Sequence, residues 1–154
     1  MQRRFLHIIL AATEDGRYLA ESAEAVIASS HACGVETCLT VAAPASVEST
    51  VQGALAAGPE IQILLIDTDS LAHLYNSGAE ASDSEVILFL REGVLLHEAA
   101  LRTLLESLAL DASIGAVGPF TDRTVYSWQN LNGAHMQEGG EDPSTWLGRR
   151  ITGP

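Results

Sequence analysis

Residues 85–119, EVILFLREGVLLHEAALRTLLESLALDASIGAVGP, decide the fold class of this chain. They begin with a short apolar run, Val86–Leu90, of the kind that forms a strand buried on both faces. The polar turn Arg91–Gly93 follows, and Glu98–Leu110 then carries a leucine stripe at helical spacing. Ile114–Val117 is again short and apolar. The stretch therefore predicts a strand, a helix and a second strand, which is typical of a parallel sheet.

The same alternation continues towards the N-terminus. Further apolar runs predict buried strands at Phe5–Ala12, Glu36–Ala42 and Ile61–Ile66. Stretches with helical spacing lie at Tyr18–Ala32, at Val47–Ala57 with Ser46 as its N-cap, and at Leu71–Ala81. We therefore expect an α/β fold, a mainly parallel sheet with helices on both faces.

The pattern stops after Pro119, which divides the chain into two parts. Residues 1–119 are expected to form the α/β domain, and residues 120–154 an irregular C-terminal segment that holds both tryptophans, Trp128 and Trp146. That segment is a candidate contact with a second copy of the chain or with a partner domain, or the start of a further domain. Both indole rings suit packing or a sugar face.

Composition excludes several classes of function. The formal net charge is −12 and all eight basic residues are Arg, which argues against nucleic acid as a partner and removes any lysine chemistry. Cys33 and Cys38 fit neither a redox nor a zinc motif. No apolar run approaches the roughly 18 residues of a membrane span, and the N-terminal run reads as a strand rather than a signal peptide. We expect a cytoplasmic protein.

Polar side chains follow several of the predicted strands. Because ligands of an open parallel sheet bind beyond the carboxyl ends of its strands, these residues are the first candidates for a site. They are Thr13, Glu14 and Asp15 after the first strand, Asp67 and Asp69 after the third, and Arg91 and Glu92 after the fourth.

Several of these segments together resemble family 2 glycosyltransferases. The similar segments are ILAATEDGRYLAESAEAVIAS, VETCLTVAAPAS, HLYNSGAEASDSEVILFL and SIGAVGPFTDRT, and they cover roughly residues 5–125. The resemblance implies a GT-A type domain, which transfers a sugar from a nucleotide-sugar donor to an acceptor hydroxyl with the help of Mg²⁺ or Mn²⁺. It also implies the nucleotide-sugar contacts, namely Thr13, Glu14, Asp15, Asn76, Arg91 and Glu92.

The chain departs from the family at its main acidic positions. The tip of the second strand, expected at Val41–Ala43, lacks the acid that contacts the base, and the metal-binding Asp expected near Gly93 is absent. Glu92 could supply one metal ligand, or Arg91 could pair with phosphate directly. The catalytic base of the family lies in an acceptor half beyond these residues, so no catalytic residue is identified. A non-catalytic binding or assembly module on the same scaffold therefore remains the alternative.

A second acidic pair offers another metal site. Asp67 and Asp69 follow the apolar run ILLI, the arrangement by which other glycosyltransferase families hold a metal. The other interpretation is that Asp69 caps a helix beginning near Ser70 while Asp67 faces solvent. The sequence thus nominates Asp67, Asp69 and Glu92 as metal ligands, in two alternative alignments with the known enzymes.

Overall fold

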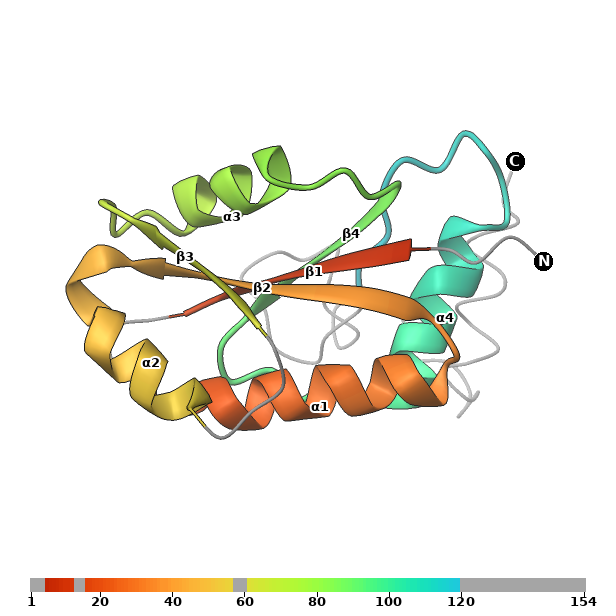
Figure 1. Cartoon of the computed structure of the whole chain (residues 1–154). Coiled ribbons are helices and arrows are strands. Elements are labelled where there is room, and N and C mark those ends of the chain that lie inside the picture. The colour runs from red at the N-terminus through yellow and green to blue at the C-terminus, as the bar shows by residue number, and fades with distance from the viewer. Residues whose placement is uncertain (1–4, 13–15, 57–60, 120–154) are drawn as a thin grey trace, which may run out of the picture.

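The chain folds as an α/β protein, and its computed structural model describes residues 5–12, 16–56 and 61–119. Figure 1 shows the elements in chain order. They are β1 (Phe5–Ala11), α1 (Leu19–Ala32), β2 (Glu36–Pro44), the short 3-10 turn η1 (Ala45–Val47), α2 (Glu48–Leu55), β3 (Gln62–Ile66), α3 (Leu71–Glu80), β4 (Val86–Arg91) and α4 (Glu98–Leu108). The first four predicted strands and the helices between them are confirmed, while the C-terminal segment 120–154 lies outside the described residues.

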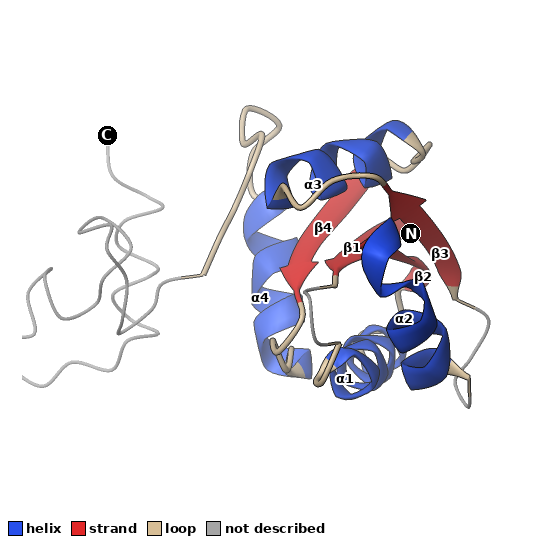
Figure 2. Ribbon diagram, turned by 90° about the vertical axis from the view of Figure 1, so that its left-hand side faces the viewer, coloured by secondary structure: helices blue, strands red, loops and turns tan. Residues whose placement is uncertain are grey.

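The sheet has four parallel strands in the order β3-β2-β1-β4. β1 is an inner strand that pairs on both sides: Ile9, for example, pairs with Thr40 of β2 and with Phe89 of β4. Figure 2 shows helices on both faces, with α3 on one side of the sheet and α1, α2 and α4 on the other. The predicted layers are therefore confirmed.

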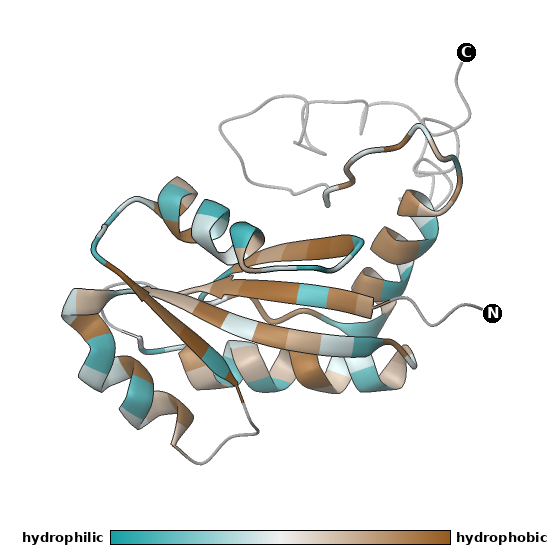
Figure 3. Ribbon diagram, turned by 45° about the horizontal axis from the view of Figure 1, so that its top comes forward, coloured by the Kyte–Doolittle hydropathy of each residue, from teal (hydrophilic) through white to brown (hydrophobic). Residues whose placement is uncertain are grey.

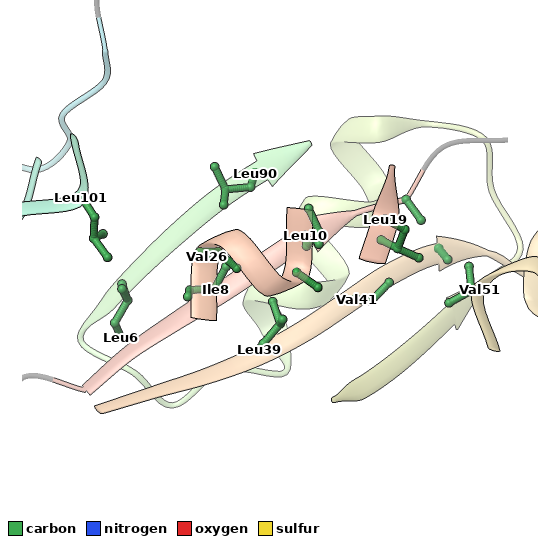
Figure 4. Close-up of a cluster of buried hydrophobic side chains, with 13 residues drawn as sticks. Leu6, Ile8, Leu10, Leu19, Val26, Leu39, Val41, Val51, Leu90 and Leu101 are labelled. Atoms are coloured by element: carbon green, nitrogen blue, oxygen red, sulfur yellow. The ribbon is translucent and has the colours of Figure 1, made fainter. Parts of the chain in front are cut away.

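The larger part of the hydrophobic core lies between the sheet and α1, α2 and α4. Alternate residues of β1 point into it, because successive strand side chains face opposite sides. Figure 4 shows how side chains of β1, β2, β4, α1, α2 and α4 converge in this core. The fully or nearly fully buried members include Leu6, Ile8, Leu10, Leu19, Val26, Leu39, Val41, Val51, Leu90 and Leu101. A smaller cluster under α3 contains Ile9, Ala11, Ala42 and Leu74.

A polar ladder crosses three strands on the face that α3 covers. His7 of β1 is only 4% exposed, and its Nε2 lies 2.7 Å from the Thr40 hydroxyl of β2. That hydroxyl donates to Gln62 Oε1 of β3 at 3.2 Å, so it accepts from the Nε2–H of His7. His7 is therefore a packed strand residue, as its place in an apolar run indicates.

We expect the burial of His7 to make the protein less stable in mild acid. Desolvation lowers the pKa of His7 below its ordinary value of 6.5. Around and below pH 6.5 the unfolded chain binds this proton more readily than the folded chain. The free energy of unfolding therefore decreases as the pH is lowered, until the pH is below the folded pKa. Urea unfolding at about pH 7.5 and about pH 5.5 measures this loss. A His7→Gln variant should lose much less free energy of unfolding between these two pH values. If the variant loses as much as the parent protein, His7 is not the group responsible.

The fifth predicted strand, Ile114–Val117, is wrong: these residues form no strand and join no sheet. The reason lies in the handedness of the connections. α1 and α2 lead the chain outward from β1 to β3 on one face, and α3 leads it back to β4 on the other. Because α4 shares the face of α1, a right-handed connection through α4 would lead back to the place that β1 already fills. A parallel strand on the free side of β4 would need a left-handed connection.

Smaller corrections concern the helix starts. Ser46 is not an N-cap, because it lies inside η1, and α2 begins after Val47 without a side-chain cap.

Within the described ranges, no helix has the length and hydropathy to cross a membrane.

Candidate functional site

The topology singles out the carboxyl ends of β1 and β4. The chain leaves β1 through α1 on one face and reaches β4 through α3 on the other, so the direction of winding reverses between these two strands. Ligands of open parallel sheets bind at such a switch point. Backbone hydrogen bonds join the strand ends at this point: Glu92 N–H donates to Ala11 O at 2.9 Å, and Ala12 N–H donates to Ala42 O at 2.9 Å.

Glu92 stands at this switch point and is bonded to the start of α1. One of its carboxylate oxygens, Oε1, accepts the backbone N–H of Tyr18 at 3.0 Å. The next residue, Gly93, donates its backbone N–H to the buried hydroxyl of Ser22 at 2.9 Å. A carboxylate is favoured here because the first N–H groups of a helix lack partners inside the helix and carry partial positive charge. The loop after β4 is thus held against the first turn of α1.

Gly93 makes this close approach with a left-handed backbone, at φ +90°. Residues with a Cβ rarely adopt that conformation, so the glycine suits the turn that brings Glu92 and Gly93 onto α1. The glycine at the expected position of the family's metal ligand therefore has a conformational role in this chain.

Arg91 lies beside Glu92 in the sequence but on the other side of the sheet. It is the last residue of β4, exposed, and two positions after Phe89, whose ring meets that of Tyr75 edge to face with 5.2 Å between centroids. Burial raises the pKa of the Tyr75 hydroxyl, and the positive charge of Arg91 opposes this to a lesser degree. Strand alternation therefore places Arg91 on the α3 side and Glu92 on the α1 side of the switch point.

Asp67 and Asp69 occupy a different part of the sheet edge. Both are exposed and follow β3, the strand at the opposite edge from β4. Strand spacing of about 4.8 Å puts the ends of β3 and β4 about 14 Å apart, whereas oxygen ligands bind a cation at about 2.0–2.6 Å. The structure therefore does not bring Asp67 and Asp69 together with Glu92, and the two predicted sites stay alternatives.

The capping role considered for Asp69 belongs to its neighbour. Ser70 is the N-cap of α3, and its hydroxyl accepts the His73 N–H at 3.5 Å. The Thr68 hydroxyl in turn accepts the Ser70 N–H at 3.1 Å. Hydroxyl groups thus serve this helix start, and the interpretation of Asp69 as the cap is wrong.

The other predicted contacts are distributed as follows. Thr13, Glu14 and Asp15 lie outside the described residues. Asn76 is exposed in the middle of α3, and α3 lies on the opposite face of the sheet from α1. Nowhere in the described ranges do three or more His, Cys, Asp or Glu side chains form a group that could hold a metal ion.

The end of β2 differs from the prediction. β2 continues to Pro44, so Val41, Ala42 and Ala43 are fully buried inside the strand and do not form its tip. The residues that follow the strand are Ala45–Val47, and the first carboxylate after them is Glu48 in α2. The acid that the family places at this tip is absent from the corrected position as well.

Sequence reasoning missed Ser22 as part of this site. The available signal was a small polar residue at a position where helical spacing places it on the buried face of α1, a feature that Ser29 and Ser30 share.

No protein-family model, curated protein or solved structure matches the chain. The assignment of function therefore rests on the geometry of the switch point and on the residues around it.

Proposed function

We propose that the chain binds a nucleotide-sugar at the switch point between β1 and β4, as a glycosyltransferase-like domain of GT-A type. The observation that carries this proposal is the reversal of winding at the ends of those strands. The order β3-β2-β1-β4 is also the start of the 3-2-1-4-5-6 order of nucleotide-binding sheets, which supports a nucleotide as the ligand.

The charges around the switch point suit a diphosphate only in part. Arg91 is exposed on the α3 side and offers a guanidinium, which binds phosphate oxygens in pairs. Glu92 is the single carboxylate among the described residues directly after β1 and β4, and one of its oxygens is already bonded to Tyr18 N–H. One carboxylate is a poor site for Mg²⁺ or Mn²⁺, which take several oxygen ligands. We therefore propose Arg91 as the main counter-charge of the diphosphate.

Thermal unfolding with added nucleotide-sugars tests this proposal. A ligand at about 100 times its dissociation constant should stabilise the protein by about 2.7 kcal/mol, which shifts the melting temperature measurably. UDP- and GDP-sugars should be titrated with and without Mn²⁺. An Arg91→Gln variant should lose most of the shift, because it removes the cation from the end of β4.

Two further variants locate the site. Arg102→Gln makes the same change of charge on α4, where the Arg102 side chain is 48% exposed and pairs with Glu98, and this variant should keep the full shift. Asp67→Asn separates the two sheet-edge sites: a shift that needs Mn²⁺ and disappears in this variant would move the ligand to β3. No shift with any nucleotide-sugar would overturn the proposal.

A binding or assembly module without catalysis is the second candidate. Glu92 favours it, because a carboxylate bonded to a helix start stabilises the fold without any ligand. The module predicts that Glu92→Gln lowers the melting temperature while no nucleotide-sugar raises that of the parent protein. A transferase instead predicts that nucleotide-sugars stabilise the parent protein.

A further inference from the structure

The outer edge of β4 is open in the described part of the chain. β4 pairs with β1 alone, and its sequence, VILFLR, has neither the proline nor the lysine that commonly protect an edge strand. Glu92 N–H points to β1, and the N–H and C=O groups of successive strand residues alternate in direction. Ile87 and Phe89 therefore direct their backbone groups towards the open edge, whereas the Arg91 carbonyl accepts the Val94 N–H at 3.2 Å.

The same edge exposes an aromatic side chain. Phe89 is 47% exposed although it lies in the middle of a strand, since α3 packs mainly on β1 and β2 and meets Phe89 with the ring of Tyr75. The hydropathy colouring of Figure 3 shows β4 as an almost continuous apolar ribbon at the edge of the sheet. Apolar side chains and unpaired backbone groups together suit a further strand.

From this edge we infer that the chain forms a homodimer through antiparallel pairing of β4 with β4 of a second copy. The strand is self-complementary about Leu88. With Leu88 on the two-fold axis, Ile87 stands opposite Phe89 of the second copy and Glu85 stands opposite its Arg91. Ile87 and Phe89 direct their backbone groups to the open edge, so the two Ile87–Phe89 pairs are hydrogen-bonded pairs of the new ladder. Glu85 directly precedes β4 and Arg91 ends it, so these two residues contribute opposite side-chain charges. The result is a continuous eight-stranded sheet, twice the four strands of one chain.

The side-chain pairs explain why this edge suits a second copy. Aromatic–aliphatic and opposite-charge cross-strand pairs each stabilise a ladder, and the two-fold axis makes each of them occur twice. The overall charge of −12 opposes self-association, whereas the β4 pairing brings opposite charges together at both ends. The other edge strand, β3, is QILLI and offers no charged residue for such pairing. A guanidinium has five donors, so Arg91 can contact Glu85 and a phosphate together.

Sedimentation over a wide range of protein concentration tests the dimer. The parent chain should dimerise, and Glu85→Arg should weaken the dimer by roughly tenfold, because attraction becomes repulsion at both ends. Adding Arg91→Glu to that variant restores the opposite-charge pairs and should restore the affinity. Phe89→Lys should weaken the dimer at least as much, and Arg102→Glu on α4 should leave it unchanged.

Hydrogen exchange supplies a second measurement that does not depend on a variant. The amides of Ile87 and Phe89 should become more protected as the protein concentration rises, while those of β3 should not change. A parent chain that stays monomeric would overturn the inference. A dimer insensitive to Glu85→Arg and Phe89→Lys would also overturn it, as would β4 protection that is independent of concentration and so arises within one chain.

Discussion

Replacing Leu101 with alanine is expected to lower the free energy of unfolding by about 2–5 kcal/mol. Leu101 is 1% exposed and is the one fully buried side chain of α4. It enters the same core cluster as the β1 and α1 leucines, as Figure 4 shows. Truncation removes its transfer free energy and leaves a cavity that a close-packed core fills only in part.

Urea unfolding followed by circular dichroism measures this loss. Leu110→Ala is the matched control, because Leu110 follows α4 and is 62% exposed; its change should stay within about 0.5 kcal/mol. A cost of under about 1 kcal/mol for Leu101→Ala would mean that α4 contributes little to the core. It would also contradict the explanation for the missing fifth strand, because that explanation requires α4 to pack on the same face of the sheet as α1.

The fold class could be predicted because the strands of this chain are short apolar runs, of which β1 and β2 are buried on both faces. β1 and β4 are nearly continuous apolar runs, and the runs are separated by helical spacing of comparable length. The strand order and the face on which each helix lies could not be predicted from the sequence pattern. Ile114–Val117 has the composition of a strand, but the position beside β4 is closed to it by the handedness of the α4 connection. A local pattern carries no information on that connection.

The site could be predicted only as a set of candidates. Arg91 and Glu92 were predicted because they are polar residues that follow a strand. Their positions in the sequence could not show that they lie on opposite sides of the sheet. That outcome depends on β4 reaching Arg91, one residue beyond the predicted strand. The bond from Tyr18 N–H to Glu92 depends on a contact between residues 74 positions apart. Distant contacts of this kind follow from packing and leave no periodic signal.

The packing of α3 on the sheet explains why a glycine stands at position 78. Gly78 is buried in α3 against the sheet, and a Cβ built on it would lie 2.6 Å from Ile9 Cγ2 and 3.1 Å from Ile9 Cδ1. Ile9 is itself fully buried at the centre of β1, so its side chain has little room to move.

We expect Gly78→Ala to destabilise the protein by about 1–3 kcal/mol, because overpacking outweighs the better helix propensity of alanine. Gly53→Ala makes the same change in α2, where a Cβ would meet nothing within 4 Å, and it should stabilise the protein by up to about 1 kcal/mol. In an Ile9→Ala background the added methyl group finds space, so the cost of Gly78→Ala should shrink by about 0.5–3 kcal/mol in a double-mutant cycle. Equal effects at both glycines, or a cycle that closes additively, would show that α3 does not rest on Ile9 and that Gly78 needs another explanation.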